Sequence, residues 1–279
     1  MTNSTIDRYA VLGNPIAHSK SPQIQQSFAE QCAEALSYEA ICAQNFADEA
    51  GKFFAQGGKG MNVTVPFKLD ALEFADELSP RASRAGASNT LILQENGRIC
   101  AENTDGVGMV RDIEQNLSWP LAGKRVLLLG AGGAVRGVIQ PLLASSPAAL
   151  HIANRTVSKA QLLADEFADI GKITASGFSD IKPGQFDIII NGSAASLQGD
   201  SLPLANGVAE GCYCYDMMYA AEPTVFMSWA KNNGALAEAD GLGMLVEQAA
   251  ESFYLWRGKR PNTAPILAQL RQQLEPKSP

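Results

Sequence analysis

Histidine and cysteine are scarce in this sequence, and neither is arranged as a metal site. The 279 residues include only two histidines, His18 and His151, so a histidine-rich metal site is excluded. The five cysteines are scattered, odd in number and without a CxxC pair: Cys32, Cys42, Cys100, Cys212 and Cys214. This pattern indicates neither a disulfide framework nor a zinc site. We therefore expect the chemistry of the protein to be metal-free.

Basic blocks and long apolar runs are also absent. With 22 basic and 29 acidic residues the formal net charge is −7, and the resulting field repels nucleic acid. No apolar run approaches the roughly 20 residues that cross a bilayer. The opening residues, MTNSTIDRYA, lack an apolar signal segment. We therefore expect a cytoplasmic protein that binds neither nucleic acid nor membrane.

The first hundred residues alternate between strand-like and helix-like segments. They read as RYAVLG, a helix from Ser21, LSYEAIC, a helix over 48–56, and GMNVTVPF. Two short strands follow, SNTLILQ and RICAEN, joined by residues 95–97, whose Asn-Gly pair is a strong hairpin signal. The sequence therefore predicts an α/β unit with a mixed sheet.

The second half of the chain continues the alternation, and 46% hydrophobic residues supply material for more than one core. Its strand-like runs are VLLLG, LHIAN, KITAS, FDIII, CYCYDM and NGALAEA, and two helices are predicted after them, over 242–256 and 263–274. A chain that ends in helices after a nucleotide-binding unit is expected to return to its first domain. We predict an α/β fold with a substrate domain over 1–105, completed by 241–279. A Rossmann-like domain is predicted over 106–240, with the active cleft between the two.

The stretch VLLLGAGGAVRG is typical of a buried strand that enters a tight turn and a helix. Gly130 and Gly132 fit the first two positions of a dinucleotide fingerprint, whereas Val135 occupies the third and Gly133 is additional. The N–H groups and the dipole at such a helix start can hold a pyrophosphate. An ordinary strand-to-helix turn is the alternative, and the residues downstream argue against it.

The next strand-like run ends in HIANRT, where an NAD-binding protein usually carries an acid for the ribose hydroxyls. This chain has Asn154, Arg155 and Thr156 there, with Lys159 one turn later. A guanidinium binds a 2′-phosphate through two hydrogen bonds, whereas an acid would repel it. These residues predict NADP as the cofactor.

Two serines lie in the segment GNPIAHSKSP. Ser21 precedes Pro22 as an N-cap serine precedes proline at the first helical position, so capping is its simplest role. Ser19 and Ser21 also lie where a strand meets the positive end of a helix, where hydroxyl and N–H groups can converge on a carboxylate. We favour anion binding by this pair.

The segment MNVTVPFK places polar residues beside a lysine. Asn62 and Thr64 alternate with valines, so a strand would turn both polar side chains to one face, toward a cleft. Pro66 is expected to start a helix with Lys68 in its first turn, where the dipole and partial burial would depress the lysine pKa. Such a lysine can transfer protons, and a solvated surface lysine is the alternative.

Asp105, in ENTDGVG, is explained locally as the N-cap of the helix that follows. At the expected junction of the domains it could also pair with Lys68, keep the ammonium oriented and accept hydrogen bonds from a polyol. Asn89 and Thr90 start a strand, and a turn role and a ligand role are equally open for them.

Taken together, these segments resemble the shikimate dehydrogenase family, whose members reduce 3-dehydroshikimate with NADPH in the route to aromatic amino acids. The motifs that carry the resemblance occur in the family's order along nearly the whole chain: GNPIAHSKSP, NVTVPFK, SNT, NTDG, GAGGA, NRT, YDMMY and MLVEQAA. The long first motif is far more specific than the glycine turn. The resemblance implies an NADP(H)-dependent oxidoreductase with shikimate and 3-dehydroshikimate as its substrates.

The resemblance also implies roles for individual residues. Lys68 and Asp105 would form the catalytic pair. The substrate contacts would be Ser19, Ser21, Asn62, Thr64, Asn89, Tyr219 and Gln248. The cofactor contacts would be Gly130, Ala131, Gly132, Gly133, Ala134, Asn154, Arg155, Thr156, Lys159, Met217 and Gly241.

Two segments depart from the familiar pattern of the family. Lys159 stands where many members carry arginine, which keeps the charge but loses the bidentate geometry, so the preference for NADP is expected to be less absolute. NGSAASL, residues 191–197, replaces the usual Asn-Ala-Thr-Ser type of segment and leaves the contacts on the nicotinamide side open.

Two rival functions remain at this point. A quinate/shikimate dehydrogenase would have broader substrate and cofactor use, and an NAD-preferring relative should carry an acid near Arg155. A non-catalytic NADP-binding protein on the same scaffold should have lost Lys68 or Asp105, and both are present. The sequence leaves a homodimer open.

Overall fold

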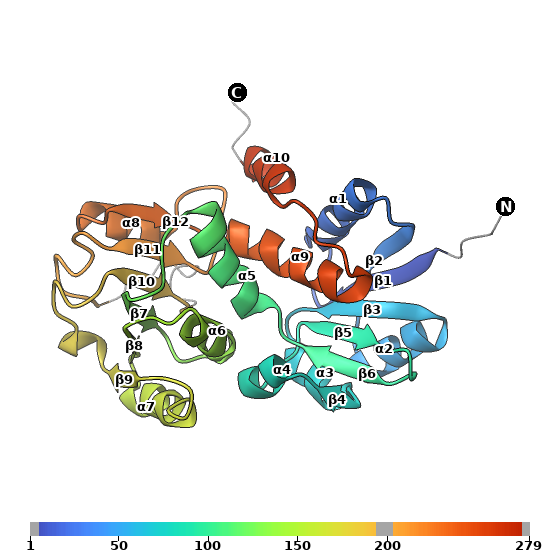
Figure 1. Ribbon diagram of the computed structural model, residues 1–279, viewed down its shortest axis with the longest axis horizontal. Helices are drawn as coiled ribbons and strands as arrows, with labels where there is room; N and C mark the ends of the chain where they lie inside the picture. The colour runs from blue at the N-terminus through green and yellow to red at the C-terminus, as the bar shows by residue number, and fades with distance from the viewer. Residues whose placement is uncertain (1–5, 194–202, 275–279) are drawn as a thin grey trace. The chain divides into compact units, whose positions relative to one another are not determined.

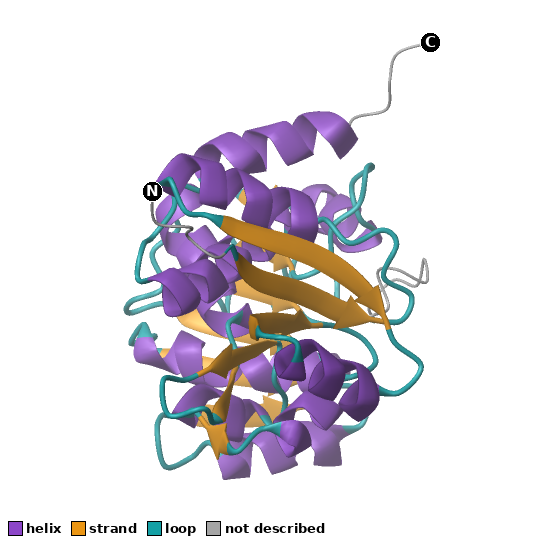
Figure 2. Cartoon of the chain, turned by 90° about the vertical axis from the view of Figure 1, so that its right-hand side faces the viewer, coloured by secondary structure: helices purple, strands orange, loops and turns teal. Residues whose placement is uncertain are grey.

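The computed structural model describes residues 6–193 and 203–274. Strands and helices alternate along the chain (Figure 1, Figure 2). Contacts divide the chain into two compact units. Unit 1 holds Met1–Gly108 and Val246–Ile266, and unit 2 holds Met109–Leu245 and Leu267–Pro279.

Unit 1 is built on a mixed six-stranded sheet, as predicted. Its strands are β1 (Asp7–Gly13), β2 (Leu36–Cys42), β3 (Gly58–Val63), β4 (Glu77–Leu78), β5 (Thr90–Leu93) and β6 (Ile99–Glu102), in the order β2-β1-β3-β5-β6-β4. β1 pairs in parallel with β2 and β3, whereas β5 is antiparallel to β3 and β6. The predicted hairpin joins β5 to β6, and its Gly97 has a φ of 80° that favours glycine.

Helices cover both faces of this sheet. They are α1 (Ser21–Cys32), α2 (Phe46–Ala55), α3 (Lys68–Phe74), α4 (Pro80–Ala85), the start of α5 (Asp105–Arg111) and the part of α9 (Leu242–Arg257) from Val246 onward. On one face, Phe28 of α1 meets Phe253 of α9 with ring centroids 6.0 Å apart. On the other face, Phe46 and Phe53 of α2 pack in a cluster with Met61 of β3. The alternation of apolar side chains along the strands supplies both cores.

Unit 2 is a parallel six-stranded sheet. Its strands are β7 (Arg125–Leu129), β8 (Ala149–Ala153), β9 (Ile173–Ser176), β10 (Ile188–Asn191), β11 (Tyr213–Asp216) and β12 (Ala237–Ala239). Each matches a strand-like run predicted from the sequence. Their order, β9-β8-β7-β10-β11-β12, is the 3-2-1-4-5-6 order of a dinucleotide-binding Rossmann domain.

Helices also cover both faces of the second sheet. They are α6 (Gly133–Ala144), α7 (Val157–Glu166) and α8 (Val225–Asn232), with a π-helical turn, η1 (Asp112–Asn116), and a 3₁₀ turn, η2 (Phe178–Asp180). The last helix, α10 (Ala264–Leu274), belongs to unit 2 from Leu267 onward. Leu128 of β7 packs in the cluster that contains α6 and α7, whereas its neighbours Leu127 and Leu129 pack in the cluster that contains α8. Every β7 side chain from Val126 to Leu129 is fully buried, as a central parallel strand requires.

The predicted domain boundaries stay a prediction, and the division by contacts differs from them at both boundaries and in the C-terminal residues. The sequence predicted 241–279 in the first domain and 106–108 in the second, whereas contacts assign 241–245 and Leu267–Pro279 to unit 2 and 106–108 to unit 1. Arg271 of α10 accounts for part of this, since its guanidinium donates to both carboxylate oxygens of Asp240.

No helix within the described residues is long and apolar enough to cross a membrane.

Candidate active site

An ion pair between Lys68 and Asp105 is the centre of the candidate site in unit 1. Lys68 is the first residue of α3 and Asp105 is the first residue of α5. The lysine Nζ donates to Asp105 Oδ2 at 2.6 Å, with side-chain exposures of 32% and 20%. The Asn89 amide donates to the other oxygen, Asp105 Oδ1, at 2.8 Å. Both carboxylate oxygens are thus bonded, which fixes the direction in which the ammonium is held.

The interpretation of Asp105 as an N-cap is wrong. Helix α5 already includes Asp105, and the Asp105 N–H donates to Asn103 Oδ1 at 3.1 Å. Helical geometry begins one residue too early for Asp105 to cap it, because the Gly108 N–H already donates to the Thr104 carbonyl oxygen. Its carboxylate is therefore directed to Lys68 and Asn89 rather than to the first turn of its own helix.

Asn89 joins the ion pair to a buried polar cluster. Its Oδ1 accepts the Thr104 N–H at 2.9 Å, and its Nδ2 lies 2.9 Å from Thr104 Oγ1 and 3.3 Å from Gln248 Oε1. Gln248 can come this near because Gly108 lacks a side chain, since a Cβ there would lie 2.5 Å from the Gln248 backbone nitrogen. The close approach of α5 to α9 thus brings Asn89, Asp105 and Gln248 together.

Asn62 extends the polar cluster across the sheet. Its Nδ2 donates to Ser252 Oγ at 3.0 Å and to Thr90 Oγ1 at 3.1 Å, while its Oδ1 accepts the Tyr38 hydroxyl at 2.7 Å. Thr64 lies one residue beyond the end of β3, and its N–H continues the ladder by donating to the Leu12 carbonyl oxygen at 2.9 Å. Asn62 is therefore locked by strand neighbours, whereas Thr64 lies where the strand gives way to a loop.

Ser21 lies beside Tyr38 and is 9% exposed. Burial raises the pKa of Tyr38 well above its ordinary value, and a hydrogen bond with Ser21 opposes that shift. The capping role expected for Ser21 is wrong, because Lys20 already has helical φ and ψ angles and occupies the N-cap position. Instead, the Ser21 N–H donates to Ser19 Oγ at 3.3 Å, so the two serines contact each other.

Sequence reasoning missed three members of this cluster: Tyr38, Thr104 and Ser252. Ser252 could have been found from Gln248, because residues four apart share one face of a helix such as α9. Its Oγ lies 2.9 Å from Thr90 Oγ1 and 3.0 Å from Asn62 Nδ2. Tyr38 carries no comparable local signal, since its partners Ser21 and Asn62 come from other elements.

A buried network of charges lies next to the cluster and was also missed. Arg81 of α4 binds both carboxylate oxygens of Glu102 at 3.0 Å and donates to Glu251 at 3.0 Å. Glu251 also pairs with Arg260, and burial raises the Glu251 pKa while Arg260 and Arg81 lower it below its ordinary value. Glu102 Oε1 accepts the Asn103 N–H at 2.7 Å, which ties the network to the segment that leads into Asp105.

Unit 2 carries the glycine turn between β7 and α6. Gly130 has a φ of 107°, which side-chain-bearing residues rarely adopt, and its N–H donates to the Ala153 carbonyl oxygen at 2.8 Å. Gly132 occupies the N-cap position of α6, and apart from adjacent residues and the α6 backbone, no atom of residues 6–193 and 203–274 lies within 4 Å of a Cβ built on Gly132 or Gly133. Ala131 is half-buried and Ala134 is exposed. The open turn therefore offers N–H groups to a phosphate-bearing ligand.

Val135 stands at the third fingerprint position without blocking the turn. Its side chain occupies the space that Gly192 leaves free, since a Cβ on Gly192 would lie 2.5 Å from Val135 Cγ2. The close packing between helix and strand is thus achieved by a glycine after β10 rather than by one in α6.

Positive charge gathers at the end of β8. Arg155 and Lys159 are exposed, and Thr156 is the N-cap residue of α7. The Asn154 amide donates to the Thr156 carbonyl oxygen at 2.9 Å, which folds this segment into a tight turn. Two cations beside an open glycine turn fit a dinucleotide that carries an additional phosphate.

The remaining residues of unit 2 that were predicted to contact substrate or cofactor follow β11 and β12. Gly241 packs against the Met217 backbone, because a Cβ on Gly241 would lie 2.3 Å from the Met217 carbonyl oxygen. The fully buried carboxylate of Asp216 supports this turn by accepting from the Thr224 hydroxyl at 2.6 Å. Tyr219 is half-buried, and burial raises its pKa. Of the predicted segment 191–197, residues 194–197 lie outside the described residues.

Metal-ligating side chains do not gather anywhere in the described parts of the two units. No group of three histidine, cysteine, aspartate or glutamate residues that could hold a metal ion is found there.

The chain matches the shikimate dehydrogenase substrate binding domain over residues 11–91. It matches the shikimate / quinate 5-dehydrogenase family over 112–198 and the shikimate 5′-dehydrogenase C-terminal domain over 241–271.

Individual relatives extend over almost the whole chain. The shikimate dehydrogenase (NADP(+)) of Cellvibrio japonicus is 56% identical over 274 residues, which cover 97% of this chain and 99% of the relative. Among solved structures, an Ael1 enzyme from Pseudomonas putida is 47% identical with a TM-score of 0.90, covering 95% of this chain and 98% of that one. The Thermus thermophilus shikimate 5-dehydrogenase in complex with NADP(H) and shikimate is 31% identical, with a TM-score of 0.84 and coverages of 96% and 100%. With these matches along its length, the chain belongs to the shikimate dehydrogenase family.

Proposed function

We propose that this chain catalyses the reversible, NADPH-dependent reduction of 3-dehydroshikimate to shikimate. The observation that carries the proposal is the Lys68–Asp105 ion pair, 2.6 Å long and held by Asn89. In this pair the Lys68 ammonium is a proton donor that lies next to amide and hydroxyl groups suited to a polyol. Unit 1 is the substrate-binding domain in this proposal, and unit 2 is the NADP-binding domain.

Polar groups of unit 1 bind the substrate. Ser19 and Ser21 hold its carboxylate through hydroxyl groups at the start of α1. The ring hydroxyls are bound by amides and hydroxyls of the remaining substrate residues, Asn62, Thr64, Asn89 and Gln248, with Tyr219 from unit 2. Asn62 and Asn89 are held in fixed orientations by their neighbours, which suits them to bind one arrangement of ring hydroxyls.

The residues of unit 2 fit NADP(H). The exposed turn at Gly132 and Gly133 can bind the pyrophosphate through backbone N–H groups. Arg155 and Lys159 can bind the 2′-phosphate, with Asn154 and Thr156 shaping the turn between them. The other contacts proposed are Gly130, Ala131, Ala134, Met217 and Gly241. When bound, NADPH supplies the hydride that reduces the ring ketone.

Lys68 handles the proton. As negative charge develops on the ketone oxygen, the Lys68 ammonium donates a proton to it, and Asp105 keeps the ammonium oriented throughout. The lysine side chain is 32% exposed, so water can return the proton afterwards. In the opposite direction the Lys68 amine accepts the proton of the shikimate hydroxyl. Because Asp105 holds Lys68 in one position, the lysine can donate the proton during reduction and accept it during oxidation from the same place.

A spectrophotometric assay tests the proposal. NADPH or NADH absorbance is followed with shikimate and with quinate, each with NADP and with NAD. The proposal expects shikimate with NADP to give the highest kcat/KM. Comparable turnover of quinate, or of NAD, would replace it by the quinate/shikimate dehydrogenase alternative. Absence of turnover with all four pairs would leave a non-catalytic NADP-binding protein.

Two further parts of the proposal concern the state of the protein in the cell. We place it in the cytoplasm, and cell fractionation tests this. A homodimer is proposed as its assembly, and sedimentation equilibrium gives the mass that decides between one and two chains.

A further inference from the structure

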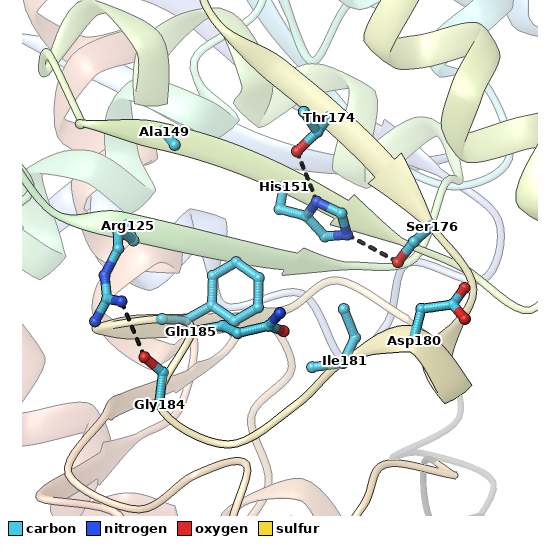
Figure 3. Close-up of a pocket in the computed structure, with 10 residues that line it drawn as sticks. Arg125, Ala149, His151, Thr174, Ser176, Asp180, Ile181, Gly184 and Gln185 are labelled. Carbon is cyan, nitrogen blue, oxygen red and sulfur yellow. Dashed lines mark hydrogen bonds between the residues drawn. The ribbon is translucent and has the colours of Figure 1, made fainter.

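His151 takes no part in the mechanism above, yet its ring is bonded at both nitrogens. It projects from β8 into a pocket of about 550 Å³ in unit 2 (Figure 3). Its Nδ1 lies 2.7 Å from Thr174 Oγ1 and its Nε2 lies 2.8 Å from Ser176 Oγ. Both partners belong to β9, the last strand at this edge of the sheet. The imidazole therefore bridges two neighbouring strands.

The strand register explains why one ring can reach both hydroxyls. His151 lies opposite Thr174 in the parallel pairing of β8 with β9, and Ser176 lies two residues further along. Residues two apart on a strand project from the same face. His151 thus contacts its direct neighbour and the next residue on that face, close to the point where both strands end.

The hydroxyl partners determine where the ring carries its proton. Ser176 Oγ donates to the Gly177 carbonyl oxygen at 3.0 Å, so it accepts from a proton on His151 Nε2. Nδ1 then accepts from the Thr174 hydroxyl. Burial lowers the pKa of His151, which favours this neutral form, while Asp180 opposes the shift.

Ser176 in turn fixes the turn that contains Arg155. Its carbonyl oxygen accepts the Asn154 N–H at 3.2 Å, the pairing that immediately precedes Arg155. On the other side, Gly177 faces the first residue of α7, since a Cβ added to Gly177 would lie within van der Waals distance of Val157, 3.4 Å from its Cγ2. The Ser176–Gly177 pair therefore bonds the residue before Arg155 and faces the residue that starts the helix after it.

We propose that His151 is a positioning residue for cofactor selectivity, which acts through Ser176 to hold the Arg155 turn in the shape that binds a 2′-phosphate. This inference rests on the proposed use of NADP. An exposed guanidinium loses conformational entropy when it binds a phosphate, and so does the backbone that carries it. A turn that is already fixed before binding reduces the entropy that the backbone loses. The effect should therefore concern the 2′-phosphate and spare the rest of the nucleotide.

The charged side chains near His151 are bound to other groups and do not account for the position of its ring. Arg125 of β7, which also lines the pocket, is bound to Asp187 at 2.7 Å. Asp180 of η2 accepts the Gly177 N–H at 3.1 Å and so supports the same pair of residues. Lys182 donates to the Ser179 carbonyl oxygen at 3.2 Å. Asp180 thus holds Gly177 through its backbone N–H, whereas His151 holds Ser176 through its side-chain hydroxyl.

Binding of two adenine nucleotides tests the inference without turnover. The dissociation constants of 2′,5′-ADP, which carries the 2′-phosphate, and 5′-AMP, which lacks it, are measured by calorimetry at pH 7.5. For His151→Leu we expect 2′,5′-ADP to bind roughly three- to tenfold more weakly, the size of one lost hydrogen bond, with 5′-AMP changed less than twofold. Ser176→Ala should give the same pattern, and the double variant should add nothing to it.

Thr174→Val is the matched control. It removes the hydroxyl at the other ring nitrogen but keeps the bond to Ser176, so both nucleotides should bind as in the wild type. Retained binding of 5′-AMP shows that each variant is folded. Equal weakening of both nucleotides by His151→Leu, or unchanged binding of 2′,5′-ADP, would overturn the inference. Failure of the proposed function would appear differently, as absence of shikimate turnover by the wild type.

Discussion

Replacing Arg81 by methionine should destabilise unit 1 far more than removal of a surface charge. The change keeps most of the side-chain volume but deletes three hydrogen bonds, each 3.0 Å long, to Glu102 and Glu251. Both acids are buried, with side-chain exposures of 9% and 8%. Removing one partner from a buried ion pair costs about 3–5 kcal/mol, because the other charge stays buried.

The remaining contacts place the expected cost at the lower end of that range. Glu251 keeps its ion pair with Arg260, and Glu102 keeps the Ser79 hydroxyl at 2.8 Å and the Asn103 N–H at 2.7 Å. We therefore expect Arg81→Met to lower the free energy of unfolding by about 3 kcal/mol. Glu102→Gln added to it should recover part of this loss, because a neutral amide costs less to bury than a carboxylate.

Urea unfolding followed by Trp256 fluorescence measures the effect in unit 1. Trp256 is the tryptophan of that unit, and Phe replacements of Trp119 and Trp229 remove the signal from unit 2. Arg8→Met is the matched control, because the Arg8–Glu39 pair is 38% and 51% exposed and should contribute about 0–1 kcal/mol. If Arg81→Met costs no more than Arg8→Met, the argument from burial is wrong.

Three further predictions follow from the cofactor unit. Arg155→Ala should weaken NADP binding at least tenfold more than NAD binding, on the order of a charge-assisted hydrogen bond, and equal losses in calorimetry would contradict the 2′-phosphate contact. Gly241→Ala should cost about 1–3 kcal/mol in urea unfolding, since its Cβ would lie 2.3 Å from the Met217 carbonyl oxygen, and an unchanged midpoint would refute this close approach. Because burial lowers the His151 pKa from 6.5, the unfolded chain binds this proton first, so stability should fall as the pH drops below about 6.5. The stability of His151→Gln should fall less steeply over that pH interval. If the stability of the variant and of the wild type falls in parallel with pH, the His151 pKa is not depressed.

The strands could be predicted from the sequence to a large extent, whereas their order within each sheet comes from the structure. Period-two alternation and glycine turns are local signals, and all six strands of unit 2 lie where apolar runs occur. The Asn-Gly hairpin between β5 and β6 was equally local. Helix starts were less predictable. The sequence predicted Ser21 and Asp105 as the N-cap residues of α1 and α5, whereas both are the first residues of these helices, directly after Lys20 and Thr104.

The polar network of the candidate site could not be predicted, because its members are distant along the chain. Asn62 and Ser252 are separated by 190 residues, and Arg81 and Glu251 by 170. Only the packing of α9 against the first sheet brings these groups together, and no short motif encodes that packing. The Lys68–Asp105 pair was a hypothesis from the sequence, and the structure places its two atoms 2.6 Å apart.

The role of Lys68 is tested most directly by the kcat of Lys68→Met with saturating shikimate and NADP. Proton transfer by a positioned group contributes about 10²–10⁴ in rate, so kcat should fall by that factor while the KM for shikimate changes less than about threefold. A variant that keeps nearly the full wild-type kcat would contradict the account.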